Sequence, residues 1–375
     1  MEKFVELIRD MHEECYETVL KKIAAKKVPV AVLAVIDPKS SLDIAKKFSA
    51  VLNLTHFITF SIENLNADFE ILSIEDALNR HLCPEYIFVF NGVDARFAAK
   101  NFPASKILYP ERDNTAKIYD TFIKNLPALK KFYDSLIDEE SRKTFCGYWL
   151  GNVSNRLEKI HHSKNPHYMT PGFIPKAGAI VIDGGSYDGG TCMRFTERGF
   201  KVYGFEPDKN LFKFAAEVAK RKNFVVENVG LGAYKHEAKY LPLNGGSTHL
   251  DENGSETAQI ITLDDYVREK NLPRVDFIKL DVEGAELDIL RGAVTTIARF
   301  KPILALSAYH KWNDFWTLMN FVKSVRPDYE FALRHSYDSY EDAPAAYSEK
   351  SFDKLKAFNL EPDFRGFQEC VLFAR

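Results

Sequence analysis

Carboxylates and glycines gather at two places in the sequence where an apolar run ends. Residues 181–189 read Val-Ile-Asp-Gly-Gly-Ser-Tyr-Asp-Gly, and residues 202–207 read Val-Tyr-Gly-Phe-Glu-Pro. The first run ends in Asp183 and opens into a glycine-rich turn, whereas the second ends in Glu206. Glycines let a backbone approach a ligand closely, and an acid at a strand tip can accept hydrogen bonds from both hydroxyls of a ribose. The pattern predicts a pocket for a nucleoside cofactor.

The glycine turn favours one nucleoside cofactor over another. A dinucleotide needs Gly-x-Gly-x-x-Gly so that its pyrophosphate can lie against a helix N-terminus. Here the three positions are Gly184, Ser186 and Gly189, so a serine would crowd the pyrophosphate and the neighbouring Asp183 would repel it. S-adenosylmethionine has no phosphate, and its sulfonium and amino groups are positive, so charge favours it. We expect the following residues to bind it: Asp183, Gly184, Gly185, Ser186, Gly189, Glu206 on the ribose, Asp281, and Asn228 at the adenine edge.

Alternative roles exist for several of these residues. Strand-turn-helix glycines also serve plain packing. Asn228, just past the third predicted strand, could equally cap a loop.

A third apolar run leads into a group of acids. Residues 276–286 read Asp-Phe-Ile-Lys-Leu-Asp-Val-Glu-Gly-Ala-Glu, so Asp281, Glu283 and Glu286 are spaced across a turn and into a new helix. Acids at a buried strand end are costly unless they bind something. We therefore place these three residues near the reacting group. For Glu286 a role at the helix start is as plausible, since acids favour the first helical turn of any protein.

With these motifs the sequence resembles the FkbM-type methyltransferases. The resemblance also includes residues 262–264, Tyr309-His310-Lys311 and residues 329–335, and upstream residues 138–142 and Tyr168. It covers roughly the last two-thirds of the chain, although Gly185-Ser186 replaces the common Asp-x-Gly-Ala form of the first motif. It implies S-adenosylmethionine-dependent O-methylation, often of sugars in natural products or surface glycans. The expected partner is then a small-molecule or glycan acceptor.

Methyl transfer to a hydroxyl needs in-line placement of the oxygen and removal of one proton. Placement supplies most of the rate, and a base adds typically 10²–10⁴-fold. The candidate catalytic residues are His310, after the fifth strand, and Asp281 and Glu283; His335 is a weaker candidate. A divalent metal held by Asp281, Glu283 and His310 would also lower the hydroxyl pKa, because hard oxygen ligands suit magnesium.

Other residues near these motifs admit a structural interpretation. Asp264 is more typical of an N-cap than of a catalyst. Trp312, Phe315 and Trp316 follow His310 at helical intervals and could stack on an acceptor sugar, but packing of their helix explains most of them.

Composition favours an ordinary enzyme. The 375 residues include 50 basic and 53 acidic ones, so no broad nucleic-acid-binding face is implied. The five cysteines are odd in number and widely spread, as in a reducing compartment. The chain shows no signal peptide or membrane span, so we expect a cytoplasmic protein, with homo-oligomerisation left open. Two other classes stay in view: an NAD(P)-dependent sugar oxidoreductase or epimerase, and a cofactor-binding scaffold without catalysis.

The element pattern predicts an α/β fold with two sheets. A helix over the first 26 residues should bury Phe4, Leu7, Ile8, Met11 and Cys15. Strands near 30–36, 57–62, 86–90 and 106–109 predict a smaller Rossmann-like α/β domain over residues 1–112, without an evident ligand loop. Residues 113–170 form a helical bridging segment, with Asp138 as an N-cap. Residues 171–375 should form a doubly wound, seven-stranded methyltransferase sheet with an antiparallel last strand, its strands at 180–183, 202–206, 224–227, 277–281, 303–307, 329–334 and 369–373.

Overall fold

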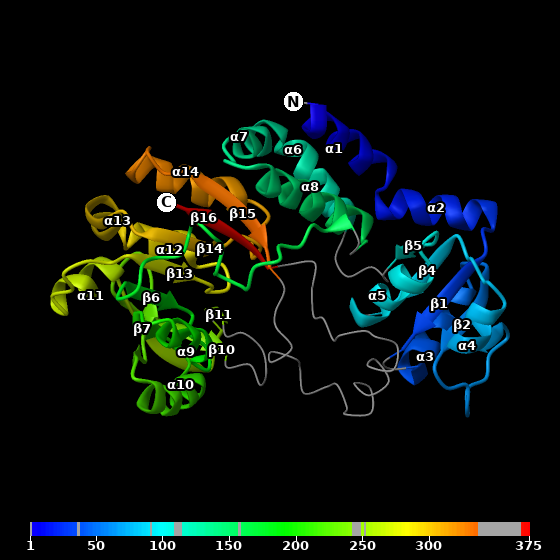
Figure 1. Cartoon of the computed structure of the whole chain (residues 1–375), viewed down its shortest axis with the longest axis horizontal. Coiled ribbons are helices and arrows are strands. Elements are labelled where there is room, and N and C mark those ends of the chain that lie inside the picture. Colours follow the sequence, from blue (N-terminus) through cyan, green and yellow to red (C-terminus); the bar gives the residue numbers. More distant parts are fainter. Residues whose placement is uncertain are drawn as a thin grey trace. The chain divides into compact units, whose positions relative to one another are not determined.

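The computed structural model describes residues 2–35, 38–90, 92–108, 115–156, 159–241, 249–250, 253–336 and 369–375, which pack into two compact units (Figure 1). The first unit comprises Met1–Leu126, Lys143–Pro166 and His335–Gln368, as far as they are described. The second comprises Pro127–Arg142, His167–Arg334 and Glu369–Arg375. Within the described ranges, no helix is long and apolar enough to cross a membrane.

The first unit is built on a five-stranded parallel sheet. Its central strand β1 (Val30–Ala34) is buried throughout, as expected for a strand covered on both faces. The strand order is β3-β2-β1-β4-β5. The other strands are β2 (Leu54–Thr59), β3 (Glu70–Ser73), β4 (Tyr86–Val89) and β5 (Lys106–Leu108). The predicted parallel α/β unit is confirmed, but β3 was not expected, and the predicted strand ends at residues 36 and 109 lie outside the described residues.

The N-terminal helical region of this unit differs from the prediction. The single helix expected over the first 26 residues is two helices, α1 (Glu2–Glu13) and α2 (Tyr16–Lys26), which are separated at Glu14 and Cys15. The predicted apolar face is nevertheless buried, apart from the half-buried Ile8. The remaining helices are α3 (Pro38–Ser49), α4 (Ile74–Asn79), α5 (Gly92–Asn101) and α6 (Thr115–Lys124).

The second unit is built on a seven-stranded mixed sheet. Its strand order is β15-β16-β14-β13-β6-β7-β8. Strands β6, β7, β8, β13 and β14 pair in parallel, whereas β16 runs antiparallel to β14. The strands are β6 (Ile180–Gly184), β7 (Lys201–Phe205), β8 (Val225–Glu227), β13 (Phe277–Leu280), β14 (Ile303–Ser307), β15 (Phe331–His335) and β16 (Cys370–Ala374). The predicted α/β fold with a parallel-sheet core, and its antiparallel last strand, are confirmed.

Register and alternation place two charged residues on one face of this sheet. Successive side chains of a strand point to opposite faces, and Asp183 pairs with Lys279 in the parallel register of β6 and β13. The same face carries Val181, Phe277 and Ala305, which pack in one apolar cluster with residues of α9 and α10. Asp183 and Lys279 therefore lie side by side at the carboxyl end of the face that carries this apolar cluster.

Helices cover the second unit in two groups. Helices α9 (Gly190–Glu197) and α10 (Lys209–Lys222) pack together and against β6, β7 and β8. Helices α11 (Leu263–Glu269), α12 (Glu286–Arg291), α13 (Val294–Phe300) and α14 (Asp314–Val325) form the other group. The chain also contains α7 (Leu126–Asp134) and α8 (Glu139–Ser154). Asp138 caps α8 as predicted, because its carboxylate accepts a hydrogen bond from the backbone N–H of Ser141 at 2.8 Å.

A second, four-stranded sheet was not anticipated. It has the order β11-β10-β12-β9 and follows the third strand of the main sheet along the chain. Its strands are β9 (Gly230–Leu231), β10 (His236–Leu241), β11 (His249–Leu250) and β12 (Glu256–Ile261). Leu231 and Ile260 of this sheet are both buried, and both line the pocket described below. The sheet therefore forms part of the pocket wall.

Candidate active site

A pocket opens at the carboxyl ends of β6, β7 and β13. Parallel α/β sheets bind ligands at this edge, because the loops there diverge and leave a crevice. The pocket is lined by acids and glycines together with apolar residues. Its lining comprises Gly184, Gly185, Tyr187, Phe205, Glu206, Pro207, Leu211, Gly230, Leu231, Ile260, Asp281, Val282, Glu283 and Ala285.

The predicted glycines divide between pocket and packing. Gly184 and Gly185 line the pocket. Gly185 has φ +76°, and a Cβ there would lie 1.9 Å from the carbonyl oxygen of Asp281, so only glycine fits where the two loops meet. Gly189 instead faces α10, where a Cβ would lie 3.2 Å from the Cα of Ala215. Its role here is close helix packing, the alternative that the sequence left open.

Two other predicted cofactor residues of the turn are buried beside the pocket and do not line it. The Asp183 carboxylate is fully buried, 2.9 Å from the Lys279 Nζ, and accepts a hydrogen bond from the Cys192 thiol. The Ser186 side chain is also buried and lies against Gly204. Neither side chain lines the pocket. Ser186 therefore does not block a pyrophosphate there by its size, as the sequence had suggested.

Lys279 is a buried cation under the glycine turn. Its ammonium donates hydrogen bonds to the carbonyl oxygens of Gly185 at 2.7 Å and Gly184 at 3.3 Å. Burial alone would lower its pKa, but the carboxylates of Asp183 and Asp281 raise it above its usual value. Lys279 therefore stays charged and fixes both the turn and the acids around it.

Glu206 lies at the end of β7, where the sequence placed the ribose-binding acid. It is 4% exposed, and its two oxygens accept hydrogen bonds from the backbone N–H groups of Tyr187 and Asp208, both at 2.9 Å. Burial raises the pKa of the carboxyl to about 7, although these two hydrogen bonds oppose the shift. Each oxygen keeps a lone pair that a ligand hydroxyl can use.

Asn228 holds a loop and does not line the pocket. Its side-chain amide donates hydrogen bonds to the carbonyl oxygens of Glu206 at 2.9 Å and Pro207 at 3.2 Å. The contact matches the loop-capping alternative, and it positions Glu206 and the apolar wall that begins at Pro207.

Asp281 is held by two phenols, one buried and one half-buried. Its Oδ2 accepts a hydrogen bond from the Tyr168 hydroxyl at 2.9 Å, and its Oδ1 accepts one from the Tyr309 hydroxyl at 3.0 Å. Burial would raise its pKa, but Lys279, His310 and His167 lower it below its usual value, so the carboxyl is ionised. Burial and the Asp281 charge raise the pKa of both phenols, so they remain proton donors.

His310 lies among the three acids of the third motif. Its Nδ1 is 2.8 Å from Glu286 Oε1, while its Nε2 is 3.5 Å from Asp281 Oδ1 and 3.6 Å from Glu283 Oε2. The chain turns sharply to achieve this, with φ +54° at Glu283 and +92° at Gly284. The three predicted catalytic residues are thus brought together.

The acids determine the charge of the histidine. Burial would lower the pKa of His310, but Glu283, Glu286 and Asp281 raise it to about 10. As the site stands, His310 is an imidazolium at neutral pH, and an imidazolium cannot accept a proton. Glu286 also accepts a hydrogen bond from the backbone N–H of Val282 at 3.0 Å, so it closes the turn as well as orienting His310.

Other side chains considered from the sequence lie elsewhere. Asp264 caps a neighbouring helix, as it accepts hydrogen bonds from the backbone N–H groups of Thr295 and Thr296 at 2.8 Å. His335 belongs to the first unit, where its ring lies 4.6 Å from that of His162. Phe315 is buried and packs on Phe132, whereas Trp312 and Trp316 are half-buried.

The sequence did not assign roles to Lys279, Tyr168, Tyr309 or Tyr187. Tyr187 lines the pocket, is 42% exposed and has φ +51°. One signal was available, because Lys279, Tyr309 and Tyr168 all fall in or beside the quoted motifs. A buried lysine within an apolar strand in particular implies a charged partner.

The fold and the pocket define a class: an α/β domain with a mainly parallel sheet and an acid-lined pocket at its strand ends. Residues 183–338 match the model of the methyltransferase FkbM domain. This part of the chain is therefore similar to the methyltransferase FkbM domain.

Two relatives and one solved structure are similar to the chain. It is 28% identical over 101 residues to hexuronic acid methyltransferase AglP of Haloferax volcanii, which is 26% of this chain and 42% of that protein. It is 24% identical over 176 residues to 2-O-methyltransferase NoeI of Sinorhizobium fredii, 40% of this chain and 72% of that protein. The crystal structure of methyltransferase FkbM from Methylobacillus flagellatus has a TM-score of 0.64 at 18% identity and covers 100% of this chain and 98% of its own, which shows a shared fold.

Proposed function

We propose that this protein is an S-adenosylmethionine-dependent O-methyltransferase that acts on a sugar hydroxyl of a glycan or natural product. The observation that carries the proposal is the pocket at the strand ends, whose lining combines Glu206, Asp281 and Glu283 with glycines and apolar residues. The match to the FkbM domain, and the names of the two relatives, a hexuronic acid methyltransferase and a 2-O-methyltransferase, support it. We take the mixed seven-stranded sheet, with β16 antiparallel to β14, to be the doubly wound methyltransferase sheet.

The pocket fits this cofactor in charge and shape. Glu206 offers a lone pair on each oxygen to the ribose hydroxyls, through charge-assisted hydrogen bonds of about 1.5–3 kcal/mol. Leu211, Leu231 and Ile260 provide an apolar wall for an adenine ring. Asp281 and Glu283 are the acids that complement the positive end of the cofactor. When bound, S-adenosylmethionine supplies an electrophilic methyl group.

The residues of the chain then orient and activate the acceptor. Asp281, Glu283 and His310 converge at the edge of the pocket, so an acceptor hydroxyl placed there would meet both the methyl group and the groups that favour its deprotonation. Placement accounts for most of the expected rate, because it makes a bimolecular step effectively intramolecular. Lys279, Tyr168 and Tyr309 act through Asp281 by holding it ionised and in place.

Ligand binding and methyl uptake test this proposal against the other two classes. Calorimetry should show S-adenosylhomocysteine binding and no comparable NAD binding. Incubation with methyl-labelled cofactor and a panel of oligosaccharides should give a labelled sugar. NAD binding without S-adenosylhomocysteine binding would support an oxidoreductase instead, and cofactor binding with no transfer to any sugar would support a scaffold.

A further inference from the structure

The imidazole of His310 is fixed in one orientation by a buried acid. Its Nδ1 lies 2.8 Å from Glu286 Oε1, and the Glu286 side chain is 1% exposed. The Nδ1–H group donates a hydrogen bond to this carboxylate, and the Nε2 nitrogen faces Asp281 and Glu283. A carboxylate that orients histidine in this way is the usual support of a metal-binding imidazole.

The Nε2 nitrogen is buried and aimed between two pocket-lining acids. The His310 side chain is 8% exposed, and Nε2 has no hydrogen-bond partner among the described residues. It lies 3.5 Å from Asp281 Oδ1 and 3.6 Å from Glu283 Oε2, at or beyond the limit of a hydrogen bond. Two ligands bound about 2.1 Å from one cation lie roughly 3.0–3.5 Å apart, so these separations suit a shared ion better.

The carboxylate of Asp281 is supported as a metal ligand would be. Tyr168 and Tyr309 each donate a hydrogen bond to one of its oxygens, at 2.9 and 3.0 Å. Each carboxylate oxygen can accept a second partner. The phenols therefore fix the orientation of the carboxylate and leave a lone pair on each oxygen for a cation. Hydrogen bonds of this kind orient metal-ligating carboxylates.

We propose that His310 Nε2, Asp281 and Glu283 bind one divalent cation of the Mg²⁺ or Mn²⁺ type, which displaces the Nε2 proton into water, with Glu286, Tyr168 and Tyr309 as positioning residues. The inference rests on the proposed function, because the acceptor hydroxyl is the further ligand that makes the site useful. The cation lowers the pKa of that hydroxyl, whose proton passes to water. The acceptor oxygen bonds to the methyl carbon as the carbon–sulfur bond breaks, and the electron pair stays on sulfur.

Manganese binding to the full-length protein tests the site directly. After treatment with EDTA and removal of the chelator, titration with Mn²⁺ followed by electron paramagnetic resonance should show one bound ion per chain. His310→Ala and Glu283→Gln should each weaken binding at least tenfold, and Tyr309→Phe should weaken it by roughly tenfold. Asp288→Asn should leave it unchanged, since that acid is exposed on α12 and pairs with Arg291.

Calorimetry with S-adenosylhomocysteine separates this inference from the proposed function and confirms that each variant is folded. If the protein binds S-adenosylhomocysteine but binds no Mn²⁺, or if His310→Ala binds Mn²⁺ as well as the wild type, the cation site is wrong and the proposed function stands. Methyl transfer that survives EDTA would overturn the catalytic part of the inference. Failure to bind S-adenosylhomocysteine would overturn the proposed function, whatever the result with Mn²⁺.

Discussion

Glu206 shows how burial alters the chemistry of a single side chain. An exposed glutamate would be ionised throughout the neutral range, but the 4% exposed Glu206 has a pKa raised to about 7 by burial. Ribose hydroxyls would donate to its ionised form. The proposed cofactor should therefore bind best when Glu206 has lost its proton, and ligand binding should lower the raised pKa of this carboxyl.

We expect the affinity for S-adenosylhomocysteine to fall as pH falls through 7. If only the ionised form binds, a free pKa of about 7 makes the affinity about tenfold weaker at pH 6 than at pH 8. Calorimetry at several pH values measures this directly, with Glu206→Gln as the variant that should bind weakly and show little pH dependence. An equal pH dependence in Glu206→Gln would assign the titration to another group.

At the scale of elements, one acid joins two helices. Asp264 lies within α11, whose N-cap is Thr262, yet its carboxylate caps α13. It accepts hydrogen bonds from the backbone N–H groups of Thr295 and Thr296 and from the Thr296 hydroxyl. The sequence suggested an N-cap, but the capped helix begins thirty residues later.

We expect Asp264→Ala to lower the free energy of unfolding by about 2 kcal/mol, because two helix N-terminal donors and a buried hydroxyl lose their acceptor. Asp264→Asn should cost less, since its amide oxygen can still accept. Urea unfolding followed by circular dichroism measures both, and the exposed Asp288→Ala is the matched control. Unfolding midpoints that are the same for Asp264→Ala and the control would contradict the capping role.

Strands with continuous apolar runs could be predicted from the sequence, and strands without them could not. All seven strands of the main sheet lie within two residues of the predicted positions, because buried parallel strands are apolar on both faces. Strands β9 and β11 have two residues each, and β10 and β12 alternate in exposure. Such segments form strands only when a neighbouring strand pairs with them.

The site residues at strand ends could be predicted from the sequence, and those brought in by tertiary contacts could not. Glu206, Asp281, Glu283 and His310 could be assigned because each ends or follows a predicted strand, and the carboxyl ends of neighbouring strands meet at one edge. The two phenols on Asp281 arise from tertiary contacts, one of them 113 residues away along the chain, and no local pattern encodes such a contact.

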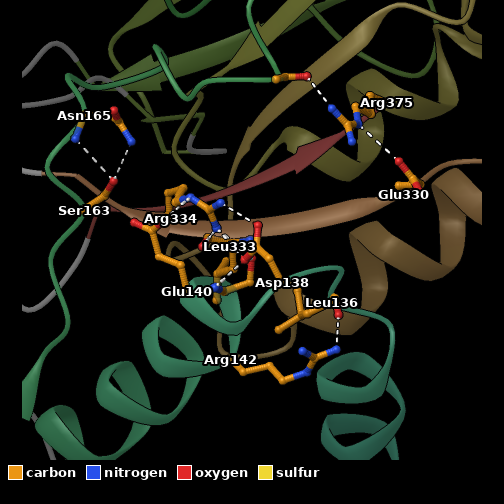
Figure 2. Close-up of polar contacts among 12 residues, drawn as sticks. Leu136, Asp138, Glu140, Arg142, Ser163, Asn165, Glu330, Leu333, Arg334 and Arg375 are labelled. Atoms are coloured by element: carbon orange, nitrogen blue, oxygen red, sulfur yellow. Dashed lines mark hydrogen bonds and ion pairs between the residues drawn. The ribbon is translucent and has the colours of Figure 1, made fainter.

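At the scale of the whole molecule, the second unit is assembled from three separate stretches of sequence. Residues Pro127–Arg142 lie well before the matched residues 183–338 but belong to the same unit as His167–Arg334. The predicted boundaries after residues 112 and 170 stay a prediction. Figure 2 shows Arg334 of β15 pointing toward Asp138 and Glu140 at the start of α8. Arg334 lies 2.7 Å from Asp138 and 3.4 Å from Glu140, and it also donates a hydrogen bond to the Ser141 hydroxyl at 2.7 Å.

This contact should make the stability of the protein sensitive to acid. Burial would raise the pKa of Asp138, but hydrogen bonds from Arg334 and Ser141 lower it to about 2. A carboxyl whose folded pKa is depressed stabilises the fold above its unfolded pKa near 4 and loses that contribution as pH falls from 4 to 2. Because the side chain is 37% exposed, solvent screening reduces the contribution to roughly 1–2 kcal/mol.

We therefore expect Asp138→Asn to be less stable than the wild type at pH 7, with most of this difference lost at pH 2.5. Asparagine keeps the helix cap, so the substitution removes the charge while the start of α8 is preserved. Urea unfolding across this pH range measures the difference, and Asp120→Asn provides the control, because that exposed acid lies 3.9 Å from Lys124 within a single helix and should change stability little at either pH. A stability difference between Asp138→Asn and the wild type that does not change with pH would mean that the Asp138 charge contributes nothing, and that Arg334 holds α8 to β15 through Ser141 and Glu140 alone.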